Sequence, residues 1–110
     1  MAKSIRFRSW VCKTIDLLDG WELSKSENLY YNSLIAVNGD SAVSFITDRK
    51  MMLVQFTFHP DMNFDKKQKF VRNIIRFPEG TSPEVCAREM KERFLPKVIE
   101  QTKTMRRLDD

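Results

Sequence analysis

Hydrophobic residues near the N-terminus recur at the three- and four-residue spacing of a helix. The residues expected on its buried face are Phe7, Trp10, Val11, Thr14, Leu17 and Leu18. Charged residues, including Arg6 and Lys13, fall on the opposite face. This pattern predicts an amphipathic helix over residues 4–18. A short opening strand is the alternative, because Ile5 and Phe7 also alternate with arginines.

From residue 21 onward, the hydrophobic period changes to that of a strand. Apolar and polar residues alternate, with aromatic and β-branched side chains, in residues 21–23, 29–37, 42–47 and 51–58. Tight turns are predicted at Asn38-Gly39 and at Asp48-Arg49. One face of the last segment carries Met52, Val54, Phe56 and Phe58. We therefore expect three or four antiparallel strands in a meander, with one face against a core.

Residues 64–76 (FDKKQKFVRNIIR) fit two kinds of structure. The apolar residues at helical spacing are Phe70, Val71, Ile74 and Ile75. Asp65 would lie in the first turn, where the helix dipole favours a negative charge. The spacing favours a helix, and the alternative is a strand over residues 71–77 that pairs with residues 51–58.

The C-terminal third predicts a long helix. Either Ser82 caps it with Pro83 at its first position, or Thr81 and Glu84 form a capping box. Its expected buried stripe consists of Ala87, Met90, Phe94, Leu95, Val98 and Met105. Pro96 falls opposite that stripe, so we expect a bend rather than a break.

These elements predict one α+β domain over residues 1–110. Its expected architecture is an antiparallel meander sheet of three to five strands, with an N-terminal helix and a long C-terminal helix packed on one face. Hydrophobic residues make up 42% of the chain, which is enough for a core. No apolar run is long enough to span a membrane and no secretory signal is recognisable, so we expect a cytoplasmic protein. Cys12 and Cys86 lie far apart in the sequence and are expected to be free, buried thiols.

His59-Pro60-Asp61 is a tripeptide that can be a functional signature. Together with Phe58, Asn63, the pair Lys69-Phe70, and Tyr30-Tyr31 with Leu34, it resembles the J-domain family of Hsp70 co-chaperones. The resemblance implies that the tripeptide lies between two antiparallel helices and engages the chaperone's ATPase. The family also needs a basic amphipathic helix directly before the tripeptide. Here only Arg49 and Lys50 are basic in residues 44–58, and the alternation is typical of a strand. We therefore interpret Pro60 as the end of a strand and keep the co-chaperone function as the last alternative.

The charge distribution suggests binding. The chain has 19 basic and 15 acidic residues, a net charge of +4 and a pI near 9.2. Its most basic segment contains Lys66, Lys67, Lys69, Arg72 and Arg76 against a single Asp65. Such a face can follow a phosphate backbone. The C-terminal third mixes acidic and basic residues and is interpreted as an ordinary exposed face.

Few residues suggest catalysis. The chain has only three glycines and no Gly-rich phosphate loop, and its single histidine makes a metal site unexpected. Cys12 or Cys86 could form a nucleophile pair with His59, but small cysteines in cores are far more common than reactive ones. We therefore expect no enzyme and no cofactor.

The function that we expect is macromolecular binding, with another protein as the partner and a role as inhibitor, adaptor or regulator. The predicted contact residues are Tyr30, Tyr31, Phe64, Lys66, Lys67, Lys69, Arg72 and Arg76. Nucleic-acid binding through residues 66–76 is the alternative. A membrane partner is not expected, and a homo-oligomer is left open.

Overall fold

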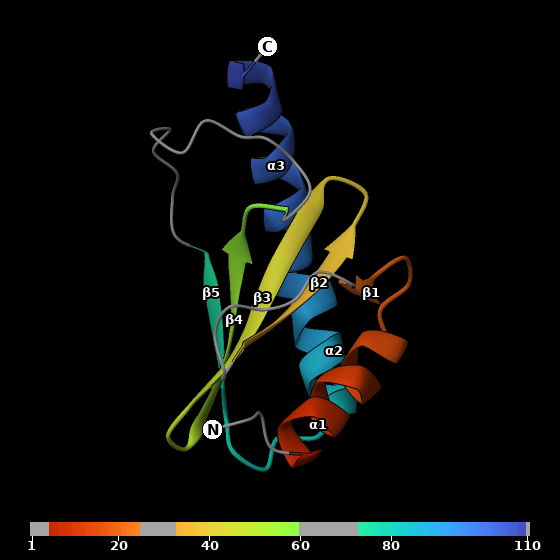
Figure 1. Cartoon of the computed structure of the whole chain (residues 1–110), viewed down its shortest axis with the longest axis vertical. Coiled ribbons are helices and arrows are strands. Elements are labelled where there is room, and N and C mark those ends of the chain that lie inside the picture. Colours follow the sequence, from red (N-terminus) through yellow and green to blue (C-terminus); the bar gives the residue numbers. More distant parts are fainter. Residues whose placement is uncertain (1–4, 25–32, 60–72, 110) are drawn as a thin grey trace.

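Five antiparallel strands form a single sheet in which spatial order equals chain order (Figure 1). A computed structural model describes residues 5–24, 33–59 and 73–109. The strands are β1 (Glu22–Leu23), β2 (Ser33–Asn38), β3 (Ser41–Asp48), β4 (Met51–Thr57) and β5 (Ile74–Pro78). The helices are α1 (Ile5–Asp16), α2 (Pro83–Arg93) and α3 (Leu95–Asp109). The predicted α+β meander is confirmed.

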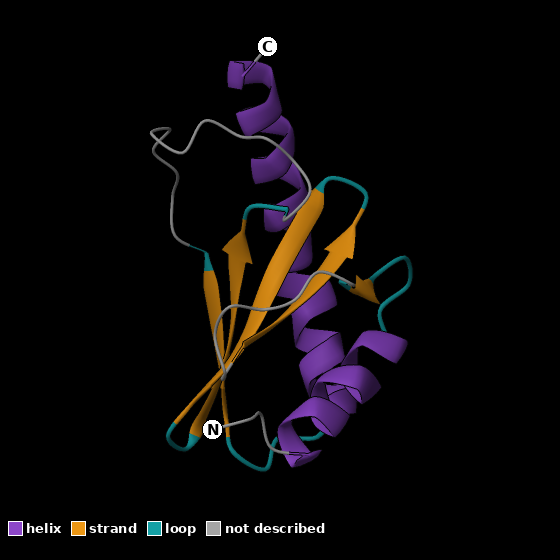
Figure 2. Cartoon of the chain, in the orientation of Figure 1, coloured by secondary structure: helices purple, strands orange, loops and turns teal. Residues whose placement is uncertain are grey.

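The hydrophobic core lies between the sheet and the helices. In Figures 1 and 2, α2 and α3 run behind the sheet and α1 lies beside α2, toward β1. Strand alternation supplies Val43 and Phe45 from β3 and Val54 and Phe56 from β4, all at most 6% exposed. Burial of each such side chain contributes about 1.5–3 kcal/mol. The predicted inner face of β4 is confirmed, with Met52 and Phe58 packed at its margins.

The buried residues of the N-terminal segment differ from the predicted ones at two positions. Phe7, Val11, Thr14 and Leu18 are buried as expected, and Trp10 is half-buried. Leu17, however, is 41% exposed, whereas Ile15 is buried. Ile15 follows Val11 by four residues and so lies on the buried stripe, whereas Leu17 lies beyond the end of α1 at Asp16, where helical spacing no longer applies.

Two predicted hairpins are present, each with its turn one residue later than expected. Asn38 pairs with Ser41, which leaves Gly39-Asp40 as the turn, and Asp48 pairs with Met51, which leaves Arg49-Lys50. In each turn only the first residue has a positive φ, 58° for Gly39 and 57° for Arg49. The two turns therefore share a positive φ at the first residue, where glycine is favoured and arginine is not.

Residues 74–78 correct the interpretation of the ambiguous segment. They form β5, which pairs with β4 from Gln55↔Ile74 to Met51↔Pro78, so the prediction of a helix there is wrong and the alternative strand is present. The physical reason is the open side of β4, where pairing satisfies main-chain groups and the alternation places Phe77 in the core. The rest of that segment, residues 64–72, lies outside the described residues.

The C-terminal helix is divided into two. Its start is as predicted: Ser82 is the cap and its Oγ accepts a hydrogen bond of 3.2 Å from the Val85 N–H. The Thr81 hydroxyl instead donates to the Pro78 carbonyl, so the capping box is not used. Phe94, with φ −122°, separates α2 from α3, so the expected bend is a break, because Pro96 cannot supply an N–H to continue the α2 ladder. Within the described residues, no helix is long and apolar enough to cross a membrane.

The segment before the J-domain-like tripeptide is a strand. β4 ends at Thr57, and His59 follows as a half-buried residue outside any regular element. Pro60 and Asp61 lie outside the described residues. The helix that the resemblance implies before His59 is therefore replaced by the β3–β4 hairpin.

Candidate functional site

Arg76 is the predicted contact residue that the structure places. The others, Tyr30, Tyr31, Phe64, Lys66, Lys67, Lys69 and Arg72, lie outside the described residues. Arg76 is exposed on β5 and lines a groove of about 540 Å³. A predicted basic contact and a hollow in the surface thus coincide.

The groove lies between β5 and one face of the C-terminal helices. The strand side comprises residues 73–78, and Thr81 closes one end. The helical side comprises Val85, Glu89, Arg93, Phe94 and Lys97. Four of these recur at intervals of four residues, so they form one stripe across the α2–α3 junction. Val85 is 36% exposed, which gives the stripe an apolar position accessible from outside.

Among the described strands β5 is an outer one, and its side away from β4 offers main-chain hydrogen-bonding groups. The Phe56 N–H donates to the Asn73 carbonyl at 2.9 Å, and the Glu79 N–H donates to the Lys50 carbonyl at 2.8 Å. In an antiparallel pair, hydrogen-bonded and non-hydrogen-bonded positions alternate. The odd-numbered residues of β5 therefore direct their main-chain N–H and C=O groups toward β4. Ile74 and Arg76 direct theirs away from it. Pro78 has no N–H and limits the edge to a short stretch.

Positive charge predominates along the groove. Arg76 and Lys97 are exposed and form no ion pair with any residue that the structure describes. Arg93 Nε lies 3.3 Å from a Glu89 carboxylate oxygen, with the arginine side chain 75% exposed. An exposed pair of this kind stabilises a helix by only about 0.3–0.5 kcal/mol, so Arg93 can leave Glu89 for another carboxylate at little cost in free energy.

Hydrogen bonds between distant residues fix the groove at both ends. The Asn73 amide donates to Gln101 Oε1 at 2.6 Å, which joins the start of β5 to α3. At the other end, Trp10 Nε1 donates to the Thr81 carbonyl at 2.9 Å. The first bond holds β5 to α3 and the second holds the β5–α2 turn to α1 before any partner arrives, which lowers the entropy cost of binding.

The helical wall is not predicted from the sequence. The mixture of charges around Arg93 and Lys97 is typical of an ordinary exposed face, and no pattern marks Val85. The signal that could have found them is the four-residue repeat from Val85 to Lys97. The repeat indicates a binding surface only once β5 is known to lie opposite it.

Nucleophilic chemistry finds no support at Cys86. Both cysteines are free as predicted, with Cys12 half-buried and Cys86 fully buried. Burial raises the pKa of the Cys86 thiol to about 12, so the thiolate that a nucleophile needs is suppressed. In the described part of the chain, no group of three or more metal-ligating side chains occurs. No protein-family model, curated protein or solved structure matches this chain.

Proposed function

We propose that this chain is a cytoplasmic binding protein that holds an extended, acidic segment of another protein in the groove beside β5, as an adaptor or regulator. The observation that carries the proposal is the outer edge of β5, which pairs with no strand of the described ranges other than β4 and lies opposite the stripe from Val85 to Lys97. An edge strand next to a helix gives an extended peptide both main-chain partners and side-chain contacts.

Main-chain pairing would supply the affinity. Ile74 and Arg76 each direct one N–H and one C=O out of the sheet, so a short partner strand can add to β5. Alternate side chains of that strand would then point toward the helical stripe, where Val85 can contact an apolar one. Pro78 restricts the pairing to the part of β5 that lies before it.

Charge would select the sequence of the partner. Three cations line the groove, Arg76 from the strand and Arg93 and Lys97 from the helices. Glu89 is the acidic residue in the described lining. Aspartate or glutamate side chains of an added strand can pair with these cations. A basic segment would be repelled.

Nucleic acid is the second candidate, because the same cations could contact phosphates. The groove also has apolar lining residues, Val85 and the half-buried Ile74 and Ile75. These favour a peptide over a nucleic acid, because a peptide can supply apolar side chains to contact them. A nucleic-acid complex would instead weaken steeply between about 50 and 200 mM salt.

Site-specific photo-crosslinking tests the proposal. A benzophenone amino acid is introduced in place of Val85, in cells that express the protein, and crosslinked products are identified by mass spectrometry. The matched control carries the same group in place of Leu17, which is also exposed but lies at the end of α1. We expect position 85 to capture an acidic peptide segment and position 17 not to.

Charge reversal provides the second control. Arg76→Glu should abolish the crosslink from position 85, whereas Lys103→Glu, an equal change on an exposed part of α3, should leave it intact. Equal capture from positions 85 and 17, insensitivity to Arg76→Glu, or a product that nuclease removes would overturn the proposal.

A further inference from the structure

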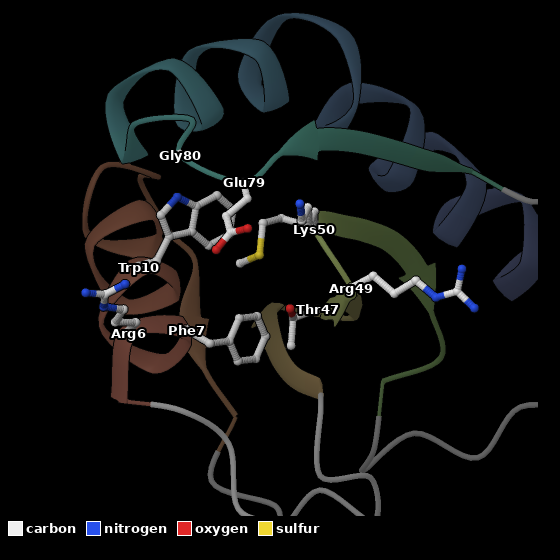
Figure 3. Close-up of a pocket in the computed structure, with 9 residues that line it drawn as sticks. Arg6, Phe7, Trp10, Thr47, Arg49, Lys50, Glu79 and Gly80 are labelled. Atoms are coloured by element: carbon white, nitrogen blue, oxygen red, sulfur yellow. The ribbon is translucent and has the colours of Figure 1, made fainter.

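A second hollow lies on the other side of the β5–α2 turn from the groove. It has a volume of about 350 Å³, within the range of small-molecule sites, and its described lining comes from α1, the β3–β4 hairpin and the β5–α2 turn (Figure 3). We call it the α1 pocket. Its apolar surface comes from Phe7, Trp10 and Met52. The groove is lined by Pro78 and Thr81 of the same turn, whereas this pocket is lined by Glu79 and Gly80.

The walls of the α1 pocket are joined by hydrogen bonds. The Trp10 indole bonds to the Thr81 carbonyl, and the Glu79 N–H bonds to the Lys50 carbonyl at 2.8 Å. Helix, turn and hairpin are thus linked directly to one another. The Trp10 ring also contacts Phe45 edge-on, with centroids 6.2 Å apart, which fixes its orientation. A rigid apolar hollow of this kind can take a ligand without first having to be ordered.

The rim of the α1 pocket carries an excess of positive charge. Arg6, Arg49 and Lys50 line it against the single carboxylate of Glu79, and all four side chains are exposed. None of them forms an ion pair with a residue in the described ranges. Figure 3 shows the Arg6 and Arg49 side chains on opposite sides of the pocket, each extending outward from its apolar residues, with the Glu79 carboxylate beside the Trp10 ring. Glu79 is therefore placed to compete with an incoming anion.

The backbone at Arg49 is a second, independent observation. Its φ of 57° is the conformation that Gly39 adopts in the preceding hairpin, and a side chain at such a position costs about 1–2 kcal/mol. Strained residues of this kind cluster at functional sites. Here the strained residue is an arginine that lines a pocket. A glycine at this position would form the same turn without the steric cost.

From these features we infer that the α1 pocket binds a small amphipathic anion, whose apolar ring contacts Phe7, Trp10 and Met52 and whose carboxylate is held by the cationic rim. The net positive rim favours an anion over a cation of the same shape. The inference is independent of peptide binding in the groove.

Three probes with the same ring test the charge preference. They are indole-3-propionate, its neutral amide and tryptamine, each titrated at millimolar concentration into ¹⁵N-labelled full-length protein. The Trp10 indole N–H reports on the pocket, and the Trp21 indole N–H is the matched control, because Trp21 is a core residue that does not line the pocket. We expect a saturable shift of the Trp10 signal that is largest for the anion, smaller for the amide and weakest for tryptamine.

Exposed charges allow variants that keep the fold. Lys50→Gln should weaken indole-3-propionate binding, and Glu79→Gln should tighten it, each roughly twofold to fivefold. Lys103→Gln, far along α3, should change nothing. Binding of tryptamine as tight as that of the anion, weaker anion binding in Glu79→Gln, or no shift of Trp10 with any probe would overturn the inference.

Discussion

The indole N–H of Trp10 donates a hydrogen bond of 2.9 Å to the Thr81 carbonyl, although the two residues are 71 positions apart. The same ring contacts Phe45 and Phe77, with centroids 6.2 and 6.5 Å away. Trp10 therefore joins α1, the sheet and the β5–α2 turn. Because that turn separates the groove from the α1 pocket, one side chain stabilises the walls of both.

Replacing Trp10 by phenylalanine should destabilise the protein by about 1–2 kcal/mol, because the Thr81 carbonyl loses its donor while most ring contacts remain. Urea unfolding measures the difference. Trp10→Ala, which also removes the ring, should cost about 3–5 kcal/mol. A Trp10→Phe protein as stable as the wild type would show that the hydrogen bond contributes nothing.

Arg49→Gly should stabilise the fold by about 1 kcal/mol, because glycine adopts a positive φ without the steric cost of a side chain. The same variant should weaken anion binding in the α1 pocket, since it removes a rim charge. Lys50→Gly is the control, as Lys50 has no positive φ and should lose stability instead. Thermal unfolding of the two variants gives the comparison, and a loss of stability in Arg49→Gly would contradict the strain.

In the native protein, Cys12 should react with a thiol reagent such as iodoacetamide and Cys86 should not, because Cys86 has no exposed surface. In urea both should react. Intact-mass spectrometry at pH 8 counts the modified thiols. Two modifications of the folded chain would contradict the burial of Cys86.

Stability should also fall at high pH because of Cys86. Burial raises its pKa from 9.0 to about 12, so above pH 9 the unfolded chain releases a proton that the folded chain keeps. The unfolding free energy should therefore decrease by about 1.4 kcal/mol per pH unit between these values. Cys86→Ala should lack this part of the slope, and urea titrations of both proteins from pH 8 to about 11 isolate it. Parallel slopes for the two proteins would contradict the shift.

Ile74→Pro should reduce partner binding at the groove about fivefold or more while leaving the fold intact, because it removes an N–H that points away from β4. Ile75→Pro is the matched control. It removes an N–H that faces β4, so it should destabilise the sheet itself. Thermal unfolding separates the two variants, and retained crosslinking from position 85 in Ile74→Pro would argue against strand addition.

Much of the fold could be predicted because its elements are encoded locally. The spacing of Phe7, Val11 and Thr14 is enough to indicate α1, and the alternation of Val54 and Phe56 is enough to indicate β4. Ser82 and Pro83 mark the start of α2 through short-range capping. In each case the deciding residues lie within one element.

The candidate site could be predicted only at Arg76. The spacing that includes Ile74 and Ile75 favours a helix over the strand alternative, so the local pattern indicates the wrong conformation around Arg76. The conformation depends on the side of β4 that does not pair with β3. That side can accept another strand only after the meander has formed.

The sequence by itself determined the class of the fold, the two hairpins and the start of the C-terminal helices, because hydrophobic periodicity and turn and cap residues act over a few positions. Tertiary structure alone decided that residues 74–78 pair with β4, that their outer edge lies opposite Val85 and Lys97, and that Trp10 meets Thr81. The reason is that main-chain pairing and close packing depend on which surfaces remain unsatisfied after the local elements form, and that information is distributed over the whole chain.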